Sequence, residues 1–215
     1  HKLVKDIILV VARANKKAML ALVKKSGYKK ISSLVPGGAR RQDSVFNALK
    51  KVSASSDLVM IHDSARPFVK AEEISILIAR AKRSGAAILG VPVKATIKEV
   101  TLPARQAGSR LVVKRTLDRE NLWEIQTPQV FDRDLIIKAY QRFGKIDVTD
   151  DAALIEKLGK RVELVLGSYE NIKITAPEDL ITAKSILRSK AQREAQRDKG
   201  AKAQSMIKTY RDLPR

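Results

Sequence analysis

Short apolar runs alternate with amphipathic stretches along most of this chain, and that alternation limits the possible folds more than any other feature. The apolar runs predict strands at Asp6–Val11, Ile31–Val35, Asp57–Ile61, Ala86–Pro92, Trp123–Gln126, Val162–Leu166 and Ile172–Thr175. Helical spacing predicts helices at Asn15–Gly27, Asp43–Val52, Glu72–Ser84, Asp132–Phe143 and Asp150–Leu158, and one more from Pro177. Such an order is typical of right-handed βαβ crossovers. We therefore expect an α/β fold with a mostly parallel sheet and helices on both of its faces.

The alternation breaks between residues 93 and 124. Thr96–Leu102 and Arg110–Leu117 alternate apolar with polar residues and flank Pro103–Ser109, which predicts a protruding β-hairpin arm. A two-stranded hairpin is barely stable alone in water. We therefore expect the arm to pack against something else, such as a second subunit.

The charge of the chain indicates anionic partners. Its 215 residues carry a formal net charge of +20. Nine Lys/Arg against three Asp/Glu lie in Arg188–Arg215, where the large apolar residues of the preceding helical face are missing. We expect one domain over residues 1–188 and a basic tail, partly helical or disordered, over residues 189–215. The remaining excess is spread over the chain, and only nine aromatic residues are present, which argues against nucleic-acid binding.

Other classes of protein are excluded by composition. The chain has no cysteine, hence no disulfide, thiolate metal site or cysteine nucleophile, and its two histidines argue against a histidine-built zinc site. Its longest purely apolar run, Ile7–Ala12, is far shorter than the ~20 residues of a membrane span. We expect no membrane partner.

Two loops fall where an open parallel sheet binds ligands, beyond the carboxyl ends of its strands. Gly37–Ser44 either brings its backbone close to a ligand or is a plain glycine turn with a helix cap. In His62–Pro67, a carboxylate (Asp63) and a guanidinium (Arg66) could hold a magnesium ion and a phosphate side by side. The alternative is an internal Asp63–Arg66 ion pair that shapes the turn; the position at a strand end favours a site.

Isolated polar residues elsewhere are weaker candidates. Lys173 lies in an otherwise apolar segment and must reach solvent or meet an anion. Thr127–Gln129 and Asp147–Asp151 supply hydroxyls and carboxylates that, taken alone, indicate caps rather than sites. Arg119 follows the hairpin arm, where surface charge is the alternative interpretation.

Seven segments in order resemble the 2-C-methyl-D-erythritol 4-phosphate cytidylyltransferase family of the non-mevalonate isoprenoid pathway, from about Asp6 to Leu187. These segments are Gly37–Val45, Ile61–Phe68, Val91–Lys98, Thr116–Trp123, Gln126–Phe131, Thr149–Ala152 and Asn171–Thr175. The resemblance implies a Rossmann-like nucleotidyltransferase three-layer sandwich and a homodimer formed through the hairpin arm. It also implies Mg²⁺ as cofactor, CTP and a sugar-alcohol phosphate as substrates, and a location in the bacterial cytoplasm or the plastid stroma.

The resemblance also implies roles for individual residues. The cytosine pocket would be lined by Gly38, Ala39 and Ser44. Asp63 would place magnesium and substrate, and Lys173 would meet phosphate. The remaining substrate contacts would come from Arg66 and Thr127 and, around methylerythritol phosphate, from Thr96, Arg119 and Thr149, with Thr96 and Arg119 reaching across the dimer. We expect Asp63, Lys173 and Arg119 to be the catalytic residues.

The resemblance implies a reaction that joins the cytidylyl group of CTP to methylerythritol phosphate and releases pyrophosphate, and general chemistry is consistent with it. A phosphate monoester is mostly dianionic at neutral pH, since its second pKa is ~6. Attack on the α-phosphorus of CTP therefore needs positioning and charge cancellation rather than a general base or a covalent intermediate.

The family begins with a strand and a glycine-rich loop, with basic residues that wrap the triphosphate, and this chain starts beyond that point. We expect a βα unit of roughly 30 or more residues to be missing, and activity of the chain to depend on it. Two alternatives follow: a ribitol 5-phosphate cytidylyltransferase, and a non-catalytic, truncated nucleotide-binding remnant.

Overall fold

The computed structural model describes residues 1–101 and 111–211, with side chains as far as residue 196. The chain divides into two compact units, one of residues 1–63 and 69–169 and one of residues 64–68 and 170–215. No helix within the described ranges is both long and apolar enough to cross a bilayer.

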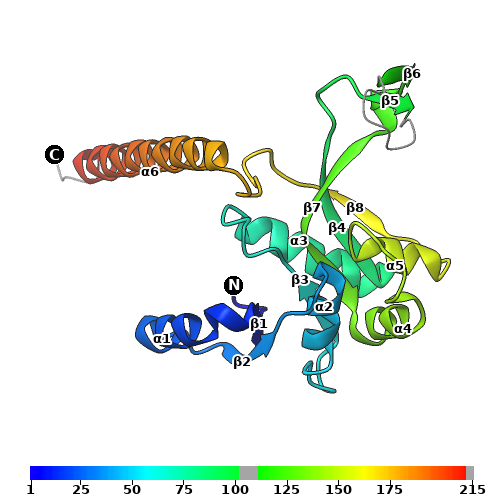
Figure 1. Ribbon diagram of the computed structural model, residues 1–215. Helices are drawn as coiled ribbons and strands as arrows, with labels where there is room; N and C mark the ends of the chain where they lie inside the picture. Colours follow the sequence, from blue (N-terminus) through cyan, green and yellow to red (C-terminus); the bar gives the residue numbers. More distant parts are fainter. Residues whose placement is uncertain (102–110, 212–215) are drawn as a thin grey trace. The chain divides into compact units, whose positions relative to one another are not determined.

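The first unit contains a four-stranded sheet in the order β3-β7-β4-β8 (Figure 1). Its strands are β3 (Leu58–Ile61), β4 (Ala86–Pro92), β7 (Trp123–Asp132) and β8 (Glu163–Leu166). β8 runs parallel to β4, but β7 is antiparallel to both β3 and β4, so this sheet is mixed rather than mostly parallel. The cause is the arm: β4 leads into it and β7 leads directly back, and strands joined in this way pair antiparallel.

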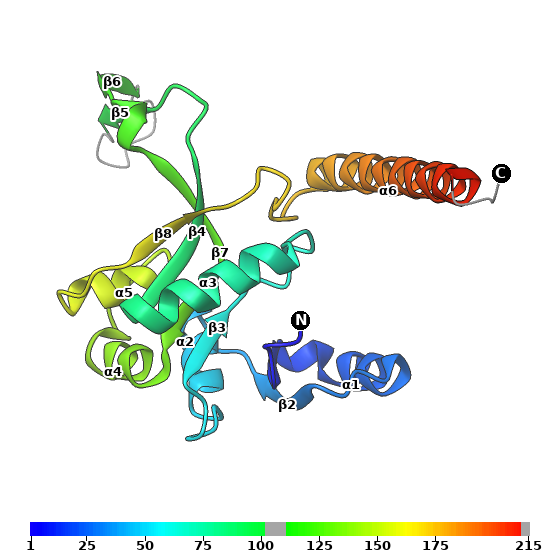
Figure 2. The ribbon, with the colours of Figure 1, turned by 180° about the vertical axis from the view of Figure 1, so that it is seen from behind.

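Helices cover both faces of this sheet, as predicted (Figure 2). On one face, α3 (Ala71–Ser84) packs Leu77 and Ala81 against Leu89 of β4 and Val130 of β7. On the other face, α2 (Arg41–Leu49), α4 (Arg133–Phe143) and α5 (Ala152–Lys157) form a second apolar cluster around Phe131. The fully buried side chains in these two clusters form the core of the unit.

The first two predicted strands form a separate sheet. β1 (Ile7–Val11) pairs in parallel with β2 (Ile31–Pro36), and the two are joined by a short 3-10 turn, η1 (Arg13–Asn15), and α1 (Lys16–Ser26). α1 ends at Gly27, whose φ of +66° is the left-handed conformation typical of a helix C-cap. No residue of α1 is fully buried. The sequence predicted the elements correctly, but not that they would lie outside the four-stranded sheet.

The hairpin arm is confirmed. β5 (Lys98–Thr101) and β6 (Val112–Thr116) pair antiparallel, and a 3-10 turn, η2 (Arg119–Asn121), leads from β6 into β7. The predicted connection Pro103–Ser109 lies outside the described residues. Leu111, Val112 and Val113 have more than half of their surface exposed, at 67%, 60% and 55%. The arm therefore presents apolar side chains that its own unit leaves uncovered.

In the second unit, α6 (Pro177–Arg211) begins at the predicted proline and continues through the segment for which only partial helix was expected. Asp179 accepts hydrogen bonds from the backbone amides of Thr175 and Ala176, both at 2.8 Å, and these bonds hold the pKa of its carboxyl below the usual range. The predicted strand Ile172–Thr175 is absent, because its Ile174 amide donates to the carbonyl of Ala65 in a loop instead of to a neighbouring strand.

Candidate functional site

The loop before α2 is tightly folded around Gly38. The Gly38 amide donates to Ser44 Oγ at 3.0 Å, and Ser44 Oγ donates to the Arg40 carbonyl at 3.2 Å. A Cβ atom on Gly38 would lie 2.4 Å from the Cβ of Asp43, closer than side-chain atoms approach each other. This position therefore requires glycine, and the loop leaves the neighbouring Ala39 exposed to solvent.

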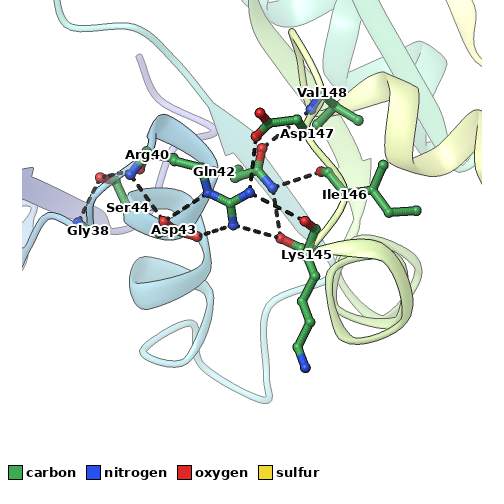
Figure 3. A network of polar contacts seen from close by, with 10 residues as sticks. Gly38, Arg40, Gln42, Asp43, Ser44, Lys145, Ile146, Asp147 and Val148 are labelled. Atoms are coloured by element: carbon green, nitrogen blue, oxygen red, sulfur yellow. Dashed lines mark hydrogen bonds and ion pairs between the residues drawn. The ribbon is translucent and has the colours of Figure 1, made fainter.

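Arg40 connects this loop to the segment that follows α4 (Figure 3). Its Nη2 donates to Asp43 Oδ1 at 2.8 Å, while Nη1 donates to Asp147 Oδ1 at 3.0 Å. The hydrogen bond from Arg40 holds the pKa of the Asp43 carboxyl below its usual range. Weaker contacts of 3.4 Å reach the carbonyls of Gly144 and Lys145.

Gln42 makes the deeper connection to the same segment (Figure 3). Its side chain is only 4% exposed, and its Nε2 donates to the carbonyls of Gly144 at 2.7 Å and Ile146 at 2.9 Å. Its Oε1 accepts from the Val148 amide at 3.4 Å. The side-chain amide of Gln42 thus makes hydrogen bonds with three backbone groups. Backbone groups of a loop have no regular secondary-structure partners, so they need such bonds from elsewhere.

Asp63 follows β3 and is joined to a buried polar cluster. Arg41 donates from Nε to Asp63 Oδ1 at 3.3 Å and from Nη2 to Asp151 Oδ2 at 2.8 Å. The Asp151 side chain has no exposed surface, and its other oxygen accepts from the hydroxyl of Tyr140. Three elements thereby meet at Asp63: the start of α2, the end of β3 and the start of α5.

The pKa values in this cluster follow from burial and from charge. Burial alone would lower the pKa of Arg41, but the negative charges of Asp151 and Asp63 outweigh it and raise that pKa above its ordinary value. Burial raises the pKa of the Tyr140 phenol, and the charge of Asp151 raises it further. Arg41 is therefore a fixed cation, and Tyr140 is a fixed hydrogen-bond donor.

Thr127 supports Asp63 from β7. The register of β7 against β4 shifts between Ile88 and Leu89, so Thr127 and Pro128 form a bulge there. Thr127 is buried, and its Oγ1 accepts from the Asp63 amide at 2.9 Å and lies 3.2 Å from His62 Nδ1. Thr127, for which the sequence predicted a substrate contact, is placed where it holds the backbone of Asp63.

The other predicted residues lie in three further places. Thr149 is exposed in the segment between α4 and α5. At the base of the arm, Thr96 is exposed, and Arg119 donates from Nη1 to the Lys94 carbonyl at 2.9 Å. In the second unit, Arg66 is buried and donates to the Asn171 carbonyl at 2.7 Å, and Lys173 is exposed.

Six polar residues of the site were given no individual role by the sequence reasoning, although five of them lie in candidate segments that it named. They are Arg40, Arg41, Gln42, Gln129, Tyr140 and Asp151. A signal existed for the first three, because three large polar side chains in succession between a glycine pair and a helix are costly to place unless they have partners. For Tyr140 no signal existed, since its spacing in α4 is that of an ordinary core residue.

The residues present fit a magnesium ion that arrives with a nucleotide. In residues 1–101 and 111–211, no three His, Asp or Glu side chains gather into a metal site. Mg²⁺ in phosphate-transfer enzymes uses one or two carboxylates together with substrate oxygens. Asp63 offers one such carboxylate at the end of a strand, and its side chain is 17% exposed.

Replacing Tyr140 by phenylalanine is expected to lower the free energy of unfolding by about 2 kcal/mol, because buried Asp151 loses a charge-assisted hydrogen bond. Urea denaturation measures this change. Tyr28, which is 68% exposed, supplies the matched control, and Tyr28→Phe should change the free energy by less than about 0.5 kcal/mol. Equal effects of the two substitutions would contradict the importance of the buried cluster.

A mixed sheet between helices, with a tight glycine loop and an arginine–aspartate cluster at one edge, defines the class of this protein. It is an α/β domain whose polar cluster lies beyond the end of a sheet strand, where folds of this class commonly bind ligands.

Comparisons with known proteins identify the family. The sequence model of the 2-C-methyl-D-erythritol 4-phosphate cytidylyltransferase family matches residues 1–189. The enzyme of that name from Pelotomaculum thermopropionicum is 43% identical over 196 residues, covering 90% of this chain and 79% of the relative. The one from Desulforamulus reducens is 46% identical over 185 residues, covering 85% and 76%. The chain belongs to this family of nucleotidyltransferases, as the motifs predicted.

Solved structures agree with this assignment. The crystal structure of 4-diphosphocytidyl-2C-methyl-D-erythritol synthase from Anaerococcus prevotii is similar to this fold, with a TM-score of 0.75 and 33% sequence identity. The match covers 86% of this chain and 79% of that one. The α/β fold with its hairpin arm is therefore the fold of the family.

Proposed function

We propose that this chain joins the cytidylyl group of CTP to 2-C-methyl-D-erythritol 4-phosphate in the non-mevalonate pathway. The observation that carries the proposal is the family match over residues 1–189, at 43% identity to a relative of that name. The products are 4-diphosphocytidyl-2-C-methyl-D-erythritol and pyrophosphate. The bacterial sources of the relatives support the bacterial cytoplasm rather than the plastid stroma as the location.

The reaction exchanges one phosphorus–oxygen bond for another. A phosphate oxygen of the sugar-alcohol phosphate attacks the α-phosphorus of CTP and forms a P–O–P bridge. The bond from the α-phosphorus to the bridging oxygen of the β-phosphate breaks, and pyrophosphate leaves with the electron pair. No proton has to be removed from the attacking oxygen, because the monoester is already a dianion at neutral pH.

The residues of the chain therefore act by positioning and by charge. The loop around Gly38, Ala39 and Ser44 would receive the cytosine base. Asp63, held by Arg41 and Thr127, would hold Mg²⁺, which when bound cancels negative charge on the phosphates. In the second unit, the exposed Lys173 would meet phosphate.

The sugar-alcohol phosphate would be held by the remaining predicted residues. They are Thr96, Arg119 and Thr149. Arg66 is proposed as a further substrate contact, and Thr127 would act through Asp63. Thr96, Arg119 and Thr149 are exposed, as ligand contacts require. Arg119 offers a planar fork that matches a phosphate, and its position at the base of the arm supports a catalytic role toward the site of a second subunit.

A homodimer formed through the arm is part of the proposal. The exposed apolar residues Leu111, Val112 and Val113 support it, since burying such a patch against a second copy removes apolar surface from water. Sedimentation velocity should show a dimer that Val113→Lys dissociates. A monomer in the wild type would contradict this part of the proposal.

The test of function uses purified protein with CTP, Mg²⁺ and one sugar-alcohol phosphate at a time. Pyrophosphate release should occur with 2-C-methyl-D-erythritol 4-phosphate and be at least about a hundredfold slower with ribitol 5-phosphate. The reverse preference would identify the sister activity. Absence of release with both would favour the non-catalytic interpretation.

Changing the loop that is proposed to meet the base should affect CTP more than the second substrate. The double variant Gly38→Ala, Ser44→Ala forces a Cβ against Asp43 and removes the hydroxyl that holds the loop. We expect the KM for CTP to rise at least about tenfold more than the KM for the sugar-alcohol phosphate. Steady-state kinetics with each substrate varied in turn measures both values, and equal increases would place the base pocket elsewhere.

A further inference from the structure

We propose that Arg40 and Gln42 are positioning residues that couple the nucleotide loop to the segment that carries Thr149, so that CTP binding orders the site of the second substrate. The proposal rests on the function proposed above, and it adds a link between its two substrate sites. The nucleotide loop is residues 37–44, and the Thr149 segment is residues 144–151.

The first half of the Thr149 segment is attached to α2 as well as to its own neighbours in α4. Gln42 Nε2 donates to the carbonyls of Gly144 and Ile146, and Gln42 Oε1 accepts from the Val148 amide. Arg40 adds a hydrogen bond to Asp147 at 3.0 Å (Figure 3). Arg40 and Gln42 both lie between Gly38 and Ser44, in the loop and the first turn of α2.

The second half of the segment is fixed to the sheet, to α4 and, through Arg41, to α2. Gln129 of β7 donates to Asp150 Oδ2 at 2.8 Å and accepts from the Ala152 amide at 3.2 Å. Asp151 is held by Arg41 and by Tyr140. Thr149 lies between these two sets of contacts, one made by Arg40 and Gln42 and one made by the core together with Arg41.

The two sets of contacts differ in how directly a bound nucleotide would affect them. Gln129 and Tyr140 are buried in the core. Arg40 and Gln42 flank Arg41 at the start of α2, where the loop is proposed to close around a base. A ligand that stabilises the loop therefore also stabilises the first half of the Thr149 segment.

Coupling of this kind is reciprocal: if CTP tightens binding of the sugar-alcohol phosphate, that phosphate tightens binding of CTP by the same factor. Cutting the link at Gln42 should reduce this factor and leave each pocket intact. Asn47 offers a matched control, because it also makes an amide hydrogen bond from α2, but to the Pro36 carbonyl rather than to the Thr149 segment.

The test combines hydrogen–deuterium exchange on the full chain with kinetics. CTP alone should slow exchange in residues 37–44 and 144–151 of the wild type and of Asn47→Ala. In Gln42→Met, CTP should slow exchange in residues 37–44 but no longer in residues 144–148, where the Gln42 contacts lie; residues 149–151 keep the contact of Arg41 with Asp151. At saturating CTP, the KM for the sugar-alcohol phosphate should rise about tenfold in Gln42→Met, while the dissociation constant of CTP alone changes less than about threefold.

Arg40→Lys keeps the test decisive if Gln42→Met fails to fold. It retains the positive charge near Asp43 but loses the forked contacts to Asp147 and to the carbonyls of residues 144 and 145, so the same change should appear to a smaller extent. CTP protection of residues 37–44 without protection of 144–151 in the wild type would overturn the coupling alone. No protection of residues 37–44 would overturn the proposed nucleotide site, and the coupling with it.

Discussion

Asp63→Ala is expected to lower the turnover number for cytidylyl transfer at least about a thousandfold, equivalent to about 4 kcal/mol of lost transition-state stabilisation. The reason is its position: Asp63 follows β3, with Arg41 on its carboxylate and Thr127 on its amide. Its side chain is the proposed metal carboxylate. The loss should be measured as pyrophosphate release at saturating CTP and over a range of Mg²⁺ concentrations.

Two controls separate lost chemistry from lost folding. Because Thr127 binds the backbone amide of Asp63, that hydrogen bond survives in Asp63→Ala, and circular dichroism should remain that of the wild type. Asp134→Ala removes an exposed aspartate of α4 and should retain full activity. Turnover like that of the wild type in Asp63→Ala under limiting Mg²⁺ would refute the proposed role.

Mixing two inactive variants, Arg119→Ala and Asp63→Ala, is expected to restore activity if Arg119 serves the neighbouring subunit. Each mixed dimer would then contain one site with both lesions and one with neither. Random exchange of subunits makes half of the dimers mixed, so about a quarter of the wild-type activity should return. The measurement is pyrophosphate release after equal amounts of the two proteins have been incubated together.

The outcome distinguishes three arrangements of the arm. If Arg119 serves its own subunit, every site keeps one lesion and mixing restores nothing. If Arg119 only anchors the Lys94 carbonyl, Arg119→Ala alone is nearly as active as the wild type before mixing. Arg115 pairs with Glu99 within the arm, so Arg115→Ala controls for loss of an arm arginine and should remain active.

The sequence identified most elements, because these depend on local patterns. Apolar runs located β3, β4 and β8, and the alternation on either side of residues 103–109 located the arm. The mixed sheet was not predicted, because a strand's own residues do not state the direction of its neighbours. β7 also extends six residues beyond the predicted Gln126, through a bulge that contains Pro128, a residue that usually argues against a strand interior.

The site contacts that were missed connect residues far apart in the chain. Gln42 meets the Gly144 carbonyl across 102 positions, and Arg41 meets Asp151 across 110. A single sequence shows that such side chains are polar and expensive to bury, but not which partner each one finds. For Gly38 the sequence left two interpretations open, a ligand contact and a plain turn, and the structure shows that Asp43 leaves no room for a side chain there.

The buried cluster of Arg41, Tyr140 and Asp151 has a consequence for how this enzyme can vary. Removing any one member leaves a charge or a hydroxyl enclosed without its counterpart, and such single changes are costly. Replacing all three residues together by apolar side chains of similar volume avoids that cost. The carboxylate of Asp63 then loses its hydrogen bond from Arg41. Laboratory evolution for stability and selection for turnover should therefore favour different residues at these three positions.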